Sequence, residues 1–292
     1  MFTVFGANGN TGSVVARRLI EAGKNVRLVV RNPDKVAALR SRGAEVVKGD
    51  VTDAGTVEPA LAGAEGAYLL VPPDNKSNDL VGRGRRIVDN YLGGLTAAKV
   101  PHAVMLSSIG AQRPSGTGPI VTVHYAEKTL PKAAATRFTF VRAAYFMENI
   151  LAFAYPMKQD GVLPVLGGGE SHPFPMVATR DIGTVAADAL LAPPAATQWI
   201  ELSGPREYSF VDAAAAASRI LGRTVKATPV PLDAIVPTLT RLGFTENVAG
   251  LYREMIAAFG AGLGFEGKGR AVHFPWAAPV TRGELLAKSF TI

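Results

Sequence analysis

The stretch Gly6-Ala7-Asn8-Gly9-Asn10-Thr11-Gly12 decides the fold of this chain. An apolar run at residues 2–5 precedes it, and a helical pattern begins directly at residue 12. A second apolar run ends about 20 residues further on, as in βαβ units that bind dinucleotides. The free N–H groups at the start of such a helix face an anion. We therefore predict a strand, a phosphate-binding loop and a helix.

The three glycines of this loop have separate tasks. By analogy with the common Gly-x-Gly-x-x-Gly loop, Gly6 allows the tight turn, Gly9 lets the backbone approach a pyrophosphate, and Gly12 permits close packing of the helix on the strand. The alternative is a glycine turn that holds no ligand. The predicted cofactor contacts of the loop are Gly6, Asn8, Gly9, Asn10, Thr11 and Gly12.

Short apolar runs alternate with helical patterns through the first half of the chain. Strands are predicted at residues 2–5, 25–30, 45–47, 66–71, 103–106 and 138–141. Helices are predicted near residues 12–22, 33–41, 54–62, 77–98 and 122–134. This alternation predicts an α/β fold of the Rossmann type, in which helices cover both faces of a doubly wound parallel sheet.

The regular alternation stops near residue 150. We expect residues 1–150 to form the dinucleotide-binding domain and residues 151–292 a smaller α/β part that covers the substrate, with the chain free to cross between them. Thr179 is a plausible N-cap for a helix at residues 180–191. Later elements are predicted as a strand at residues 199–202, helices near 210–221, 232–242 and 247–260, and an irregular segment at 260–281.

The composition excludes several kinds of site. The chain of 292 residues has no Cys, so disulfides and thiolate chemistry are excluded. It has four His, none paired at the spacing that places two ligands on one helix face, and we expect no metal centre. No apolar run approaches the roughly 18 residues that a membrane span needs. A signal peptide is not evident, and we expect a cytoplasmic protein without a membrane partner.

The net charge of +7 raises nucleic acid as a partner. The excess is nevertheless spread thinly, with 14 basic and 10 acidic residues in 1–100, 7 and 6 in 101–200, and 10 and 8 in 201–292. We expect Arg83, Arg85 and Arg86, the densest basic group, to form a solvated helix face. Direct binding of nucleic acid is therefore not expected.

The end of the second strand predicts which dinucleotide is bound. Arg31 stands where an NAD site would have a carboxylate for the ribose hydroxyl. A guanidinium suits a 2′-phosphate by charge and geometry, and Lys35 follows one turn later. We therefore predict NADP(H) as the cofactor, with a solvated loop arginine as the alternative. Asp50 and Val51 follow the third strand, where the adenine end would lie.

A common catalytic pair is missing. In many enzymes with this fold, the ammonium of a Tyr-x-x-x-Lys motif lowers the pKa of the tyrosine, which then transfers a proton during carbonyl reduction. No lysine stands four residues after any of the seven tyrosines, and the nearest approach is Tyr125 with Lys128. Ordinary alcohol–ketone chemistry of that type is disfavoured.

Several motifs carry a resemblance to a known family over nearly the whole chain. They are the glycine loop, Arg31-Asn32-Pro33, Gly49-Asp50-Val51, Leu106-Ser107-Ser108, the segments 124–130 and 140–149, Ala178-Thr179-Arg180-Asp181, and Pro279-Val280-Thr281. With these motifs the chain resembles the NmrA-like atypical short-chain dehydrogenases. Within that family it is most similar to the NAD(P)H:quinone oxidoreductase and triphenylmethane-reductase branch.

The resemblance implies where a cofactor and an acceptor would lie. The cofactor would extend over the glycine loop, Arg31, the Val71-Pro72-Pro73 loop, Ser107 and the turn at residues 143–146, which includes Tyr145. The nicotinamide would face a cleft closed by the C-terminal part. His124 occupies a position where quinone-reductase-like members tend to have His.

The acceptor is expected to be a flat conjugated molecule. Hydride addition to a quinone gives a stabilised product that needs no strong acid, so proximity can supply much of the catalysis. We predict His124 as a hydrogen-bond donor or proton relay, with a structural helix-start histidine as the alternative. Tyr145, Phe146 and Asn149 are predicted to line the substrate pocket, although the aromatic rings suit a hydrophobic core equally well. Arg142 is expected to make a structural hydrogen bond.

Two functions are consistent with these residues. The first is an NADPH-dependent reductase of quinones or similar conjugated acceptors. The second is a non-catalytic NADP(H) sensor that acts through a protein partner, as in the regulators that the family includes. A homodimer is left open.

Overall fold

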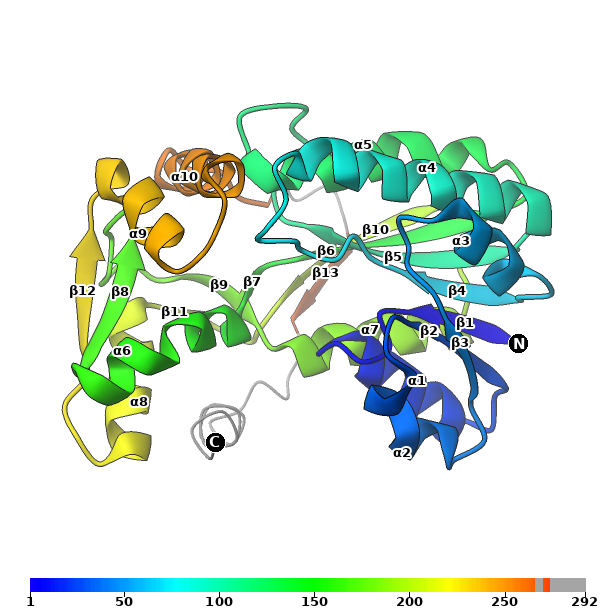
Figure 1. Ribbon diagram of the computed structural model, residues 1–292, viewed down its shortest axis with the longest axis horizontal. Helices are drawn as coiled ribbons and strands as arrows, with labels where there is room; N and C mark the ends of the chain where they lie inside the picture. Colours follow the sequence, from blue (N-terminus) through cyan, green and yellow to red (C-terminus); the bar gives the residue numbers. More distant parts are fainter. Residues whose placement is uncertain (266–269, 274–292) are drawn as a thin grey trace.

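An eight-stranded parallel sheet forms the centre of the protein in the computed structural model, which describes residues 1–265 and 270–273 (Figure 1). The strand order is β13-β10-β6-β5-β4-β1-β2-β3. The bounds are β1 Phe2–Phe5, β2 Val26–Val30, β3 Glu45–Lys48, β4 Gly66–Leu69, β5 His102–Ser108, β6 Arg137–Ala143, β10 Gln198–Ser203 and β13 Arg270–His273. The predicted parallel sheet is confirmed.

Helices cover both faces of this sheet, as Figure 1 shows. One layer contains α3 (Ala54–Leu61), α4 (Leu80–Ala98) and α5 (Val121–Thr129), and the other contains α1 (Gly12–Glu21), α2 (Ala37–Arg40) and α7 (Thr179–Leu191). Four short 3-10 helices lie in the connections: η1 Pro33–Val36, η2 Gly118–Ile120, η3 Leu130–Lys132 and η5 Leu232–Ala234. None of the helices within the described residues is long and apolar enough to span a lipid bilayer.

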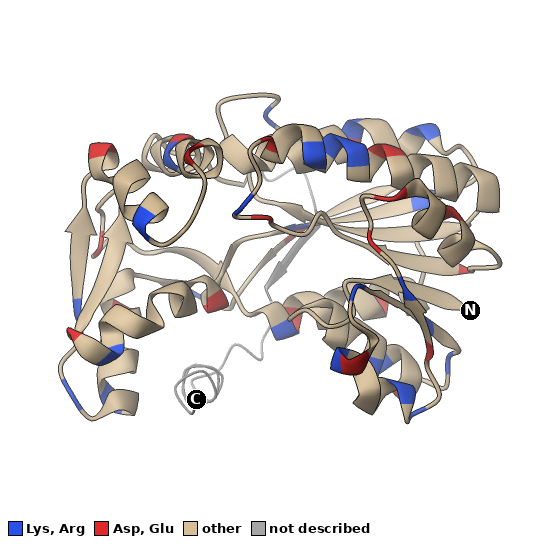
Figure 2. Ribbon diagram, in the orientation of Figure 1, with Lys and Arg blue, Asp and Glu red and all other residues tan. Residues whose placement is uncertain are grey.

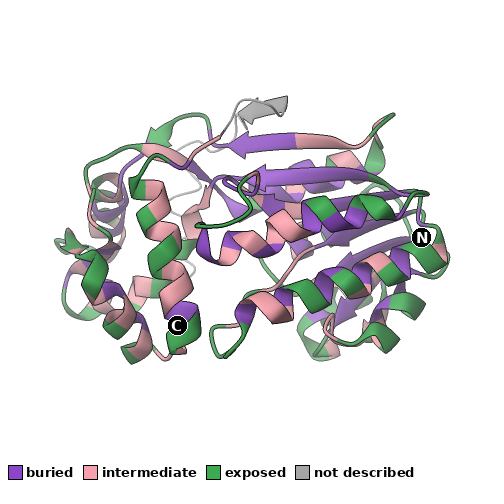
Figure 3. Ribbon diagram, turned by 90° about the horizontal axis from the view of Figure 1, so that it is seen from above, coloured by how far each residue is buried: buried purple, intermediate pink, exposed green. Residues whose placement is uncertain are grey.

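The two faces of the sheet have separate hydrophobic cores because successive strand residues point to opposite sides. Val4 and Leu28 pack in the core under α1 and α7, whereas their neighbours Phe5 and Val29 pack in the core under α3, α4 and α5. The inner strands of the sheet are buried, the edge strand β3 is partly exposed, and the outer helix faces are exposed (Figure 3). This burial on both faces explains why the strands are continuous apolar runs.

The strand order reverses direction at β1, which lies between β2 and β4. In open parallel sheets a ligand binds at such a switch point, outside the carboxyl ends of the strands. The glycine loop follows β1 at this point.

A smaller part lies beyond the carboxyl edge of the sheet (Figure 1). It includes the parallel pair of β8 (Val162–Leu166) and β12 (Lys226–Val230) and the three-stranded sheet of β7 (Tyr145–Phe146), β9 (Phe174–Val177) and β11 (Glu207–Tyr208). Its helices are η4 Met147–Phe153, α6 Ala154–Gln159, α8 Phe210–Leu221, α9 Ile235–Arg241 and α10 Glu246–Gly260. The chain crosses back to the large sheet, because α7 packs on α1 and β10 extends the sheet beside β6.

Some local predictions were wrong. The segment at 260–281 was expected to be irregular, but β13 forms within it and pairs with β10; residues 266–269 and 274–292, which include the motif at 279–281, lie outside the described residues. The helix predicted from residue 77 begins at Leu80, because the Asp79 carboxylate caps it by accepting from Gly82 N–H. Thr179 is the first residue of α7 rather than its N-cap, which is Ala178; its N–H and its hydroxyl both donate to the Glu148 carboxylate.

Candidate active site

The glycine loop is a tight turn whose middle residues, Asn8, Gly9 and Asn10, are exposed. Gly6 has φ +65°, and its carbonyl oxygen accepts the Gly9 N–H at 2.9 Å. A Cβ on residue 12 would collide with that same oxygen, so only glycine fits there. The N–H groups of Asn10 and Thr11 have no protein acceptor within the described residues, although α1 begins directly after them. The loop therefore offers backbone donors at a helix start, as an anion site requires.

The loop is fixed to the neighbouring strand by a buried hydrogen bond. The hydroxyl of Tyr68 on β4 donates to Thr11 Oγ1 at 2.8 Å. Burial raises the pKa of Tyr68 above its ordinary value, so it remains a donor. Thr11 is itself buried, whereas Asn8, Gly9 and Asn10 are exposed. The predicted contacts of the loop thus divide into a buried anchor and an exposed rim.

The charges of two arginines act on Asp50, which follows the end of β3. Arg31, directly after β2, is exposed, and its guanidinium has no hydrogen-bond partner within the described residues. Burial tends to raise the pKa of Asp50, but hydrogen bonds from Thr52 and the charges of Arg31 and Arg83 together hold it below the usual value. Lys35 lies exposed in η1. Arg31 is thus an exposed cation whose charge helps to keep Asp50 ionised.

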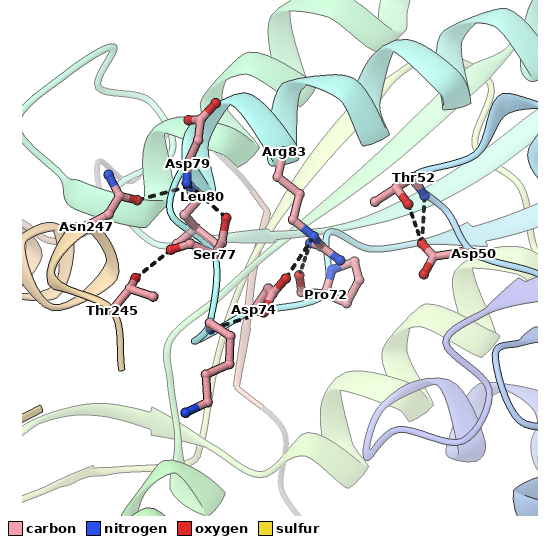
Figure 4. Close-up of polar contacts among 11 residues, drawn as sticks. Asp50, Thr52, Pro72, Asp74, Ser77, Asp79, Leu80, Arg83, Thr245 and Asn247 are labelled. Carbon is pink, nitrogen blue, oxygen red and sulfur yellow. Dashed lines mark hydrogen bonds and ion pairs between the residues drawn. The ribbon is translucent and has the colours of Figure 1, made fainter. Parts of the chain in front are cut away.

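Arg85 and Arg86 are exposed on α4, as expected of a solvated helix face, whereas Arg83 is half-buried, so the expectation was wrong for Arg83 alone. Its Nη1 donates to Pro72 O at 2.9 Å, and its Nε lies 3.3 Å from Asp74 Oδ2 (Figure 4). Arg85 lies over the Tyr125 ring. Figure 2 shows Lys and Arg dispersed among Asp and Glu over both parts of the protein. Its place near the start of a helix, just after a proline-containing loop, could have indicated that Arg83 bonds back to that loop.

Ser107 joins a buried network at the end of β5. Its hydroxyl donates to Glu127 Oε1 at 2.7 Å. The Glu127 carboxylate also accepts from Arg142 Nε and Nη2, at 3.0 and 2.6 Å, and from Trp199 Nε1 at 3.0 Å. The expected structural bond of Arg142 is confirmed, and its partner, Glu127, was not foreseen. Ser107 donates its proton to this carboxylate, so its oxygen is an acceptor toward any ligand.

His124 lies half-buried on α5. Its Nδ1 is 2.8 Å from Ala111 O. Because a carbonyl oxygen only accepts, Nδ1 carries a proton, and Nε2 is the nitrogen open to another group. Tyr125, on the same helix, donates to Asp89 instead. The backbone contact expected of a structural histidine is therefore present, and it uses only one ring nitrogen.

Tyr145 and Phe146 lie on β7 and pack on different cores. The Tyr145 ring makes edge contacts with Phe174 and Phe210, at centroid distances of 5.4 and 5.8 Å, whereas Phe146 packs against the core under α1 and α7. Burial, and to a smaller extent the nearby Tyr252, raise the pKa of Tyr145. Neighbouring strand residues point to opposite sides, so the two rings do not form one surface.

Asn149 is exposed on η4, and no hydrogen bond within the described residues joins it to His124. Val51 and Val71 are half-buried and pack on the core under α4. The structure thus groups the glycine loop, Arg31, Asp50 and the β4 loop around the switch point. It does not link the predicted acceptor-side residues to one another by hydrogen bonds.

Comparison with protein families assigns the chain. The model of the NmrA-like family matches residues 1–281. This chain belongs to the NmrA-like family. The resemblance predicted from the sequence motifs is therefore confirmed.

NmrA-like relatives include reductases. An NAD(P)H azoreductase of Xenophilus azovorans is 29% identical over 265 residues, which cover 88% of this chain and 86% of that protein. Two solved structures have the same fold. The NADPH-dependent quinone oxidoreductase of Escherichia coli, complexed with NADPH, has a TM-score of 0.77 at 22% identity and covers 99% of this chain and 100% of that one. The triphenylmethane reductase of Citrobacter sp., complexed with NADP(H), has a TM-score of 0.76 at 19% identity, with coverages of 97% and 99%.

Proposed function

We propose that this protein is an NADPH-dependent reductase that transfers a hydride to a quinone or a similar flat conjugated acceptor. The observation that carries the proposal is an anion-binding loop at the switch point of the sheet in a chain that has no Tyr-x-x-x-Lys pair. The relatives named azoreductase, quinone oxidoreductase and triphenylmethane reductase support the same class of reaction.

The residues present fit NADP(H). The N–H groups of Asn10 and Thr11 are available to a pyrophosphate, and Gly9 leaves room for its approach. Arg31 would hold the 2′-phosphate, because its guanidinium is exposed and free to form a bidentate contact. Lys35 would add a second positive charge, and Asp50 and Val51 would lie at the adenine end.

When bound, the reduced nicotinamide supplies the hydride. The protein holds the acceptor against it, and the acceptor delocalises the charge that it gains, so no strong acid is required. Ser107 presents an oxygen acceptor at the end of β5, because Glu127 takes its proton. Val71, Pro72 and the turn that includes Tyr145 would complete the cofactor side.

His124 is proposed as the catalytic hydrogen-bond donor or relay. Its Nδ1 is held by Ala111 O, which fixes the ring and directs Nε2 to the remaining partner. As an imidazolium, Nε2–H donates to a developing oxyanion, and as neutral imidazole Nε2 accepts. Tyr145, Phe146 and Asn149 are proposed for the acceptor side, and because the Tyr145 and Phe146 rings point to opposite sides of β7, only one of these two rings can face the acceptor.

A screen of NADPH oxidation tests the proposal. The wild-type protein is incubated with NADPH and a panel of quinones, azo dyes, triphenylmethane dyes and enones, beside a His124→Ala variant. We expect turnover with a member of the panel and a lower kcat in the variant. NADPH binding without turnover on any acceptor would overturn the reductase proposal and favour an NADP(H) sensor. Unchanged kcat in the variant would remove His124 from the mechanism.

A further inference from the structure

The loop between β4 and α4, residues 70–79, bridges the two parts of the protein. We call it the strap. Its partners lie about 170 positions further along the chain, at the start of α10 (Figure 4). No sequence motif predicts the contacts between the strap and the start of α10. They arise only when the two parts of the chain pack together.

Residues 245 and 247 satisfy three backbone groups of the strap and its exit. Thr245 Oγ1 donates to Ser77 O at 2.5 Å, and Thr245 N–H donates to Asn75 O at 3.0 Å. Asn247 Oδ1 accepts from Leu80 N–H, the first residue of α4, at 3.1 Å. A fourth contact uses a side chain of the strap: Lys76 Nζ donates to Gly243 O at 2.6 Å.

The other end of the strap lies against the cofactor loop. Leu70, where the strap begins, would be 2.9 Å from a Cβ on Gly6, and its carbonyl oxygen accepts from the Tyr91 hydroxyl at 3.0 Å. Pro72 O accepts from Arg83, whose charge also acts on Asp50. The root of the strap is thus held on the cofactor side, while its far end is held by the C-terminal part.

We propose that Thr245 and Asn247 are positioning residues for the cofactor: they hold the strap closed over the dinucleotide at the switch point between β1 and β4. This inference rests on the proposed function for the identity of the dinucleotide. A loop of this length without helix or strand orders its backbone only if its polar groups are paired. Loss of these partners releases residues 75–80 while the sheet remains intact.

The test uses Asn247→Ala, Thr245→Val and the double variant. Thr245 also caps α10 by accepting from Val248 N–H, whereas the Asn247 side chain accepts from Leu80 N–H at the exit of the strap, so Asn247→Ala removes this contact without removing the α10 cap. Thr240→Val is the matched control, because the Thr240 hydroxyl bonds only within its own helix region, to Val236 O and Pro237 O. Thermal melting checks that each variant is folded.

Two readouts follow the strap directly. Amide exchange at Leu80 reports the contact, and a fluorescence titration gives the Kd of NADPH without an acceptor. For Asn247→Ala we expect faster Leu80 exchange and a Kd raised about threefold to tenfold, as for the loss of one hydrogen bond. The double variant should exceed this, and Thr240→Val should match the wild type. With an acceptor, KM for NADPH should rise more than kcat falls.

Either of two results would overturn the inference. If Leu80 exchange is unchanged in the double variant, these residues do not hold the strap. If exchange is faster and the NADPH Kd is unchanged, the strap does not act on the cofactor. Since both readouts need no turnover, a wild-type protein that binds NADPH but reduces nothing contradicts the proposed reaction alone. A wild-type protein that does not bind NADPH contradicts both.

Discussion

The carbonyl oxygen of Gly6 occupies the space in which a Cβ of residue 12 would have to stand. The same oxygen accepts the Gly9 N–H at 2.9 Å, so it both closes the turn and lies against residue 12. Gly12 is thus required by the fold of the loop. Gly9, in contrast, is exposed, and a Cβ there would meet only this oxygen, at 3.3 Å.

Replacing these two glycines should therefore have different consequences. We expect Gly12→Ala to cost about 3 kcal/mol of unfolding free energy, because backbone atoms must move apart. Gly9→Ala should cost less than about 1 kcal/mol but weaken NADPH binding at least about tenfold, since its methyl group blocks the approach of the pyrophosphate. Urea unfolding and NADPH titration of both variants measure this. Equal loss of stability in the two variants would contradict the separate roles of Gly12 in the fold and Gly9 in cofactor binding.

Arg31 should decide between the two nicotinamide dinucleotides. We expect Arg31→Ala to weaken NADPH binding about tenfold to a hundredfold, because a charge-assisted bidentate contact is lost. Binding of NADH should change little, and Arg31→Lys should restore only part of the NADPH affinity. Titrations with both cofactors give the ratio. A wild-type protein that binds NADH as tightly as NADPH would refute the role of Arg31.

The buried pair of Glu127 and Arg142 should contribute strongly to stability. Both side chains are at least nine-tenths buried, with exposed fractions of 5% and 10%. We expect Glu127→Gln to cost about 3 kcal/mol, because the Arg142 charge loses its counterion. The pair of half-buried Arg27 and exposed Glu45 provides the control: Glu45→Gln should cost less than about 1 kcal/mol, because Arg27 keeps its bonds to Ala60 O and Ala62 O. Urea unfolding that gives equal values for the two variants would disprove the difference.

His102 should make stability depend on pH. Burial and the nearby Arg137 lower its pKa from 6.5 to about 4. Below pH 6.5 the unfolded chain therefore binds a proton that the folded chain does not, and stability falls until pH 4. The loss is about 3 kcal/mol.

A His102→Gln variant removes this titration. Its stability should fall by about 3 kcal/mol less than that of the wild type between pH 6.5 and 4. His172→Gln, at an exposed position, should keep the wild-type slope. Urea unfolding at several pH values compares the three proteins, and identical slopes for His102→Gln and the wild type would contradict a neutral buried His102.

Most of the large sheet was predictable because its strands are buried on both faces and its helices carry local start signals. Residues 2–5 and the loop after them were enough to predict the start of the first βαβ unit. The short strands β7 and β11 were not predictable, since each has two residues and is formed by pairing with β9. β13 was missed for the same reason, because its partner β10 lies some seventy positions earlier.

The site residues were predictable where a single short stretch of sequence contains the complete motif. The glycine loop and Arg31 are local, so their positions followed from the sequence. The role of Glu127 was not predictable, because its hydrogen-bond partners Ser107, Arg142 and Trp199 come from three different strands; the sequence showed it only as part of the motif at residues 124–130. The contact of Thr245 with the strap depends on the packing of α10 and has no sequence pattern.

Anaerobic turnover with NADPH and a quinone or triphenylmethane dye tests the central proposal most directly. The consumed NADPH and the reduced acceptor are measured in the same sample. The proposed reductase forms one molecule of reduced acceptor for each NADPH that it oxidises, and the rate falls in Gly9→Ala and Arg31→Ala. Tight NADPH binding without any consumption of NADPH, across the whole acceptor panel, would contradict a reductase.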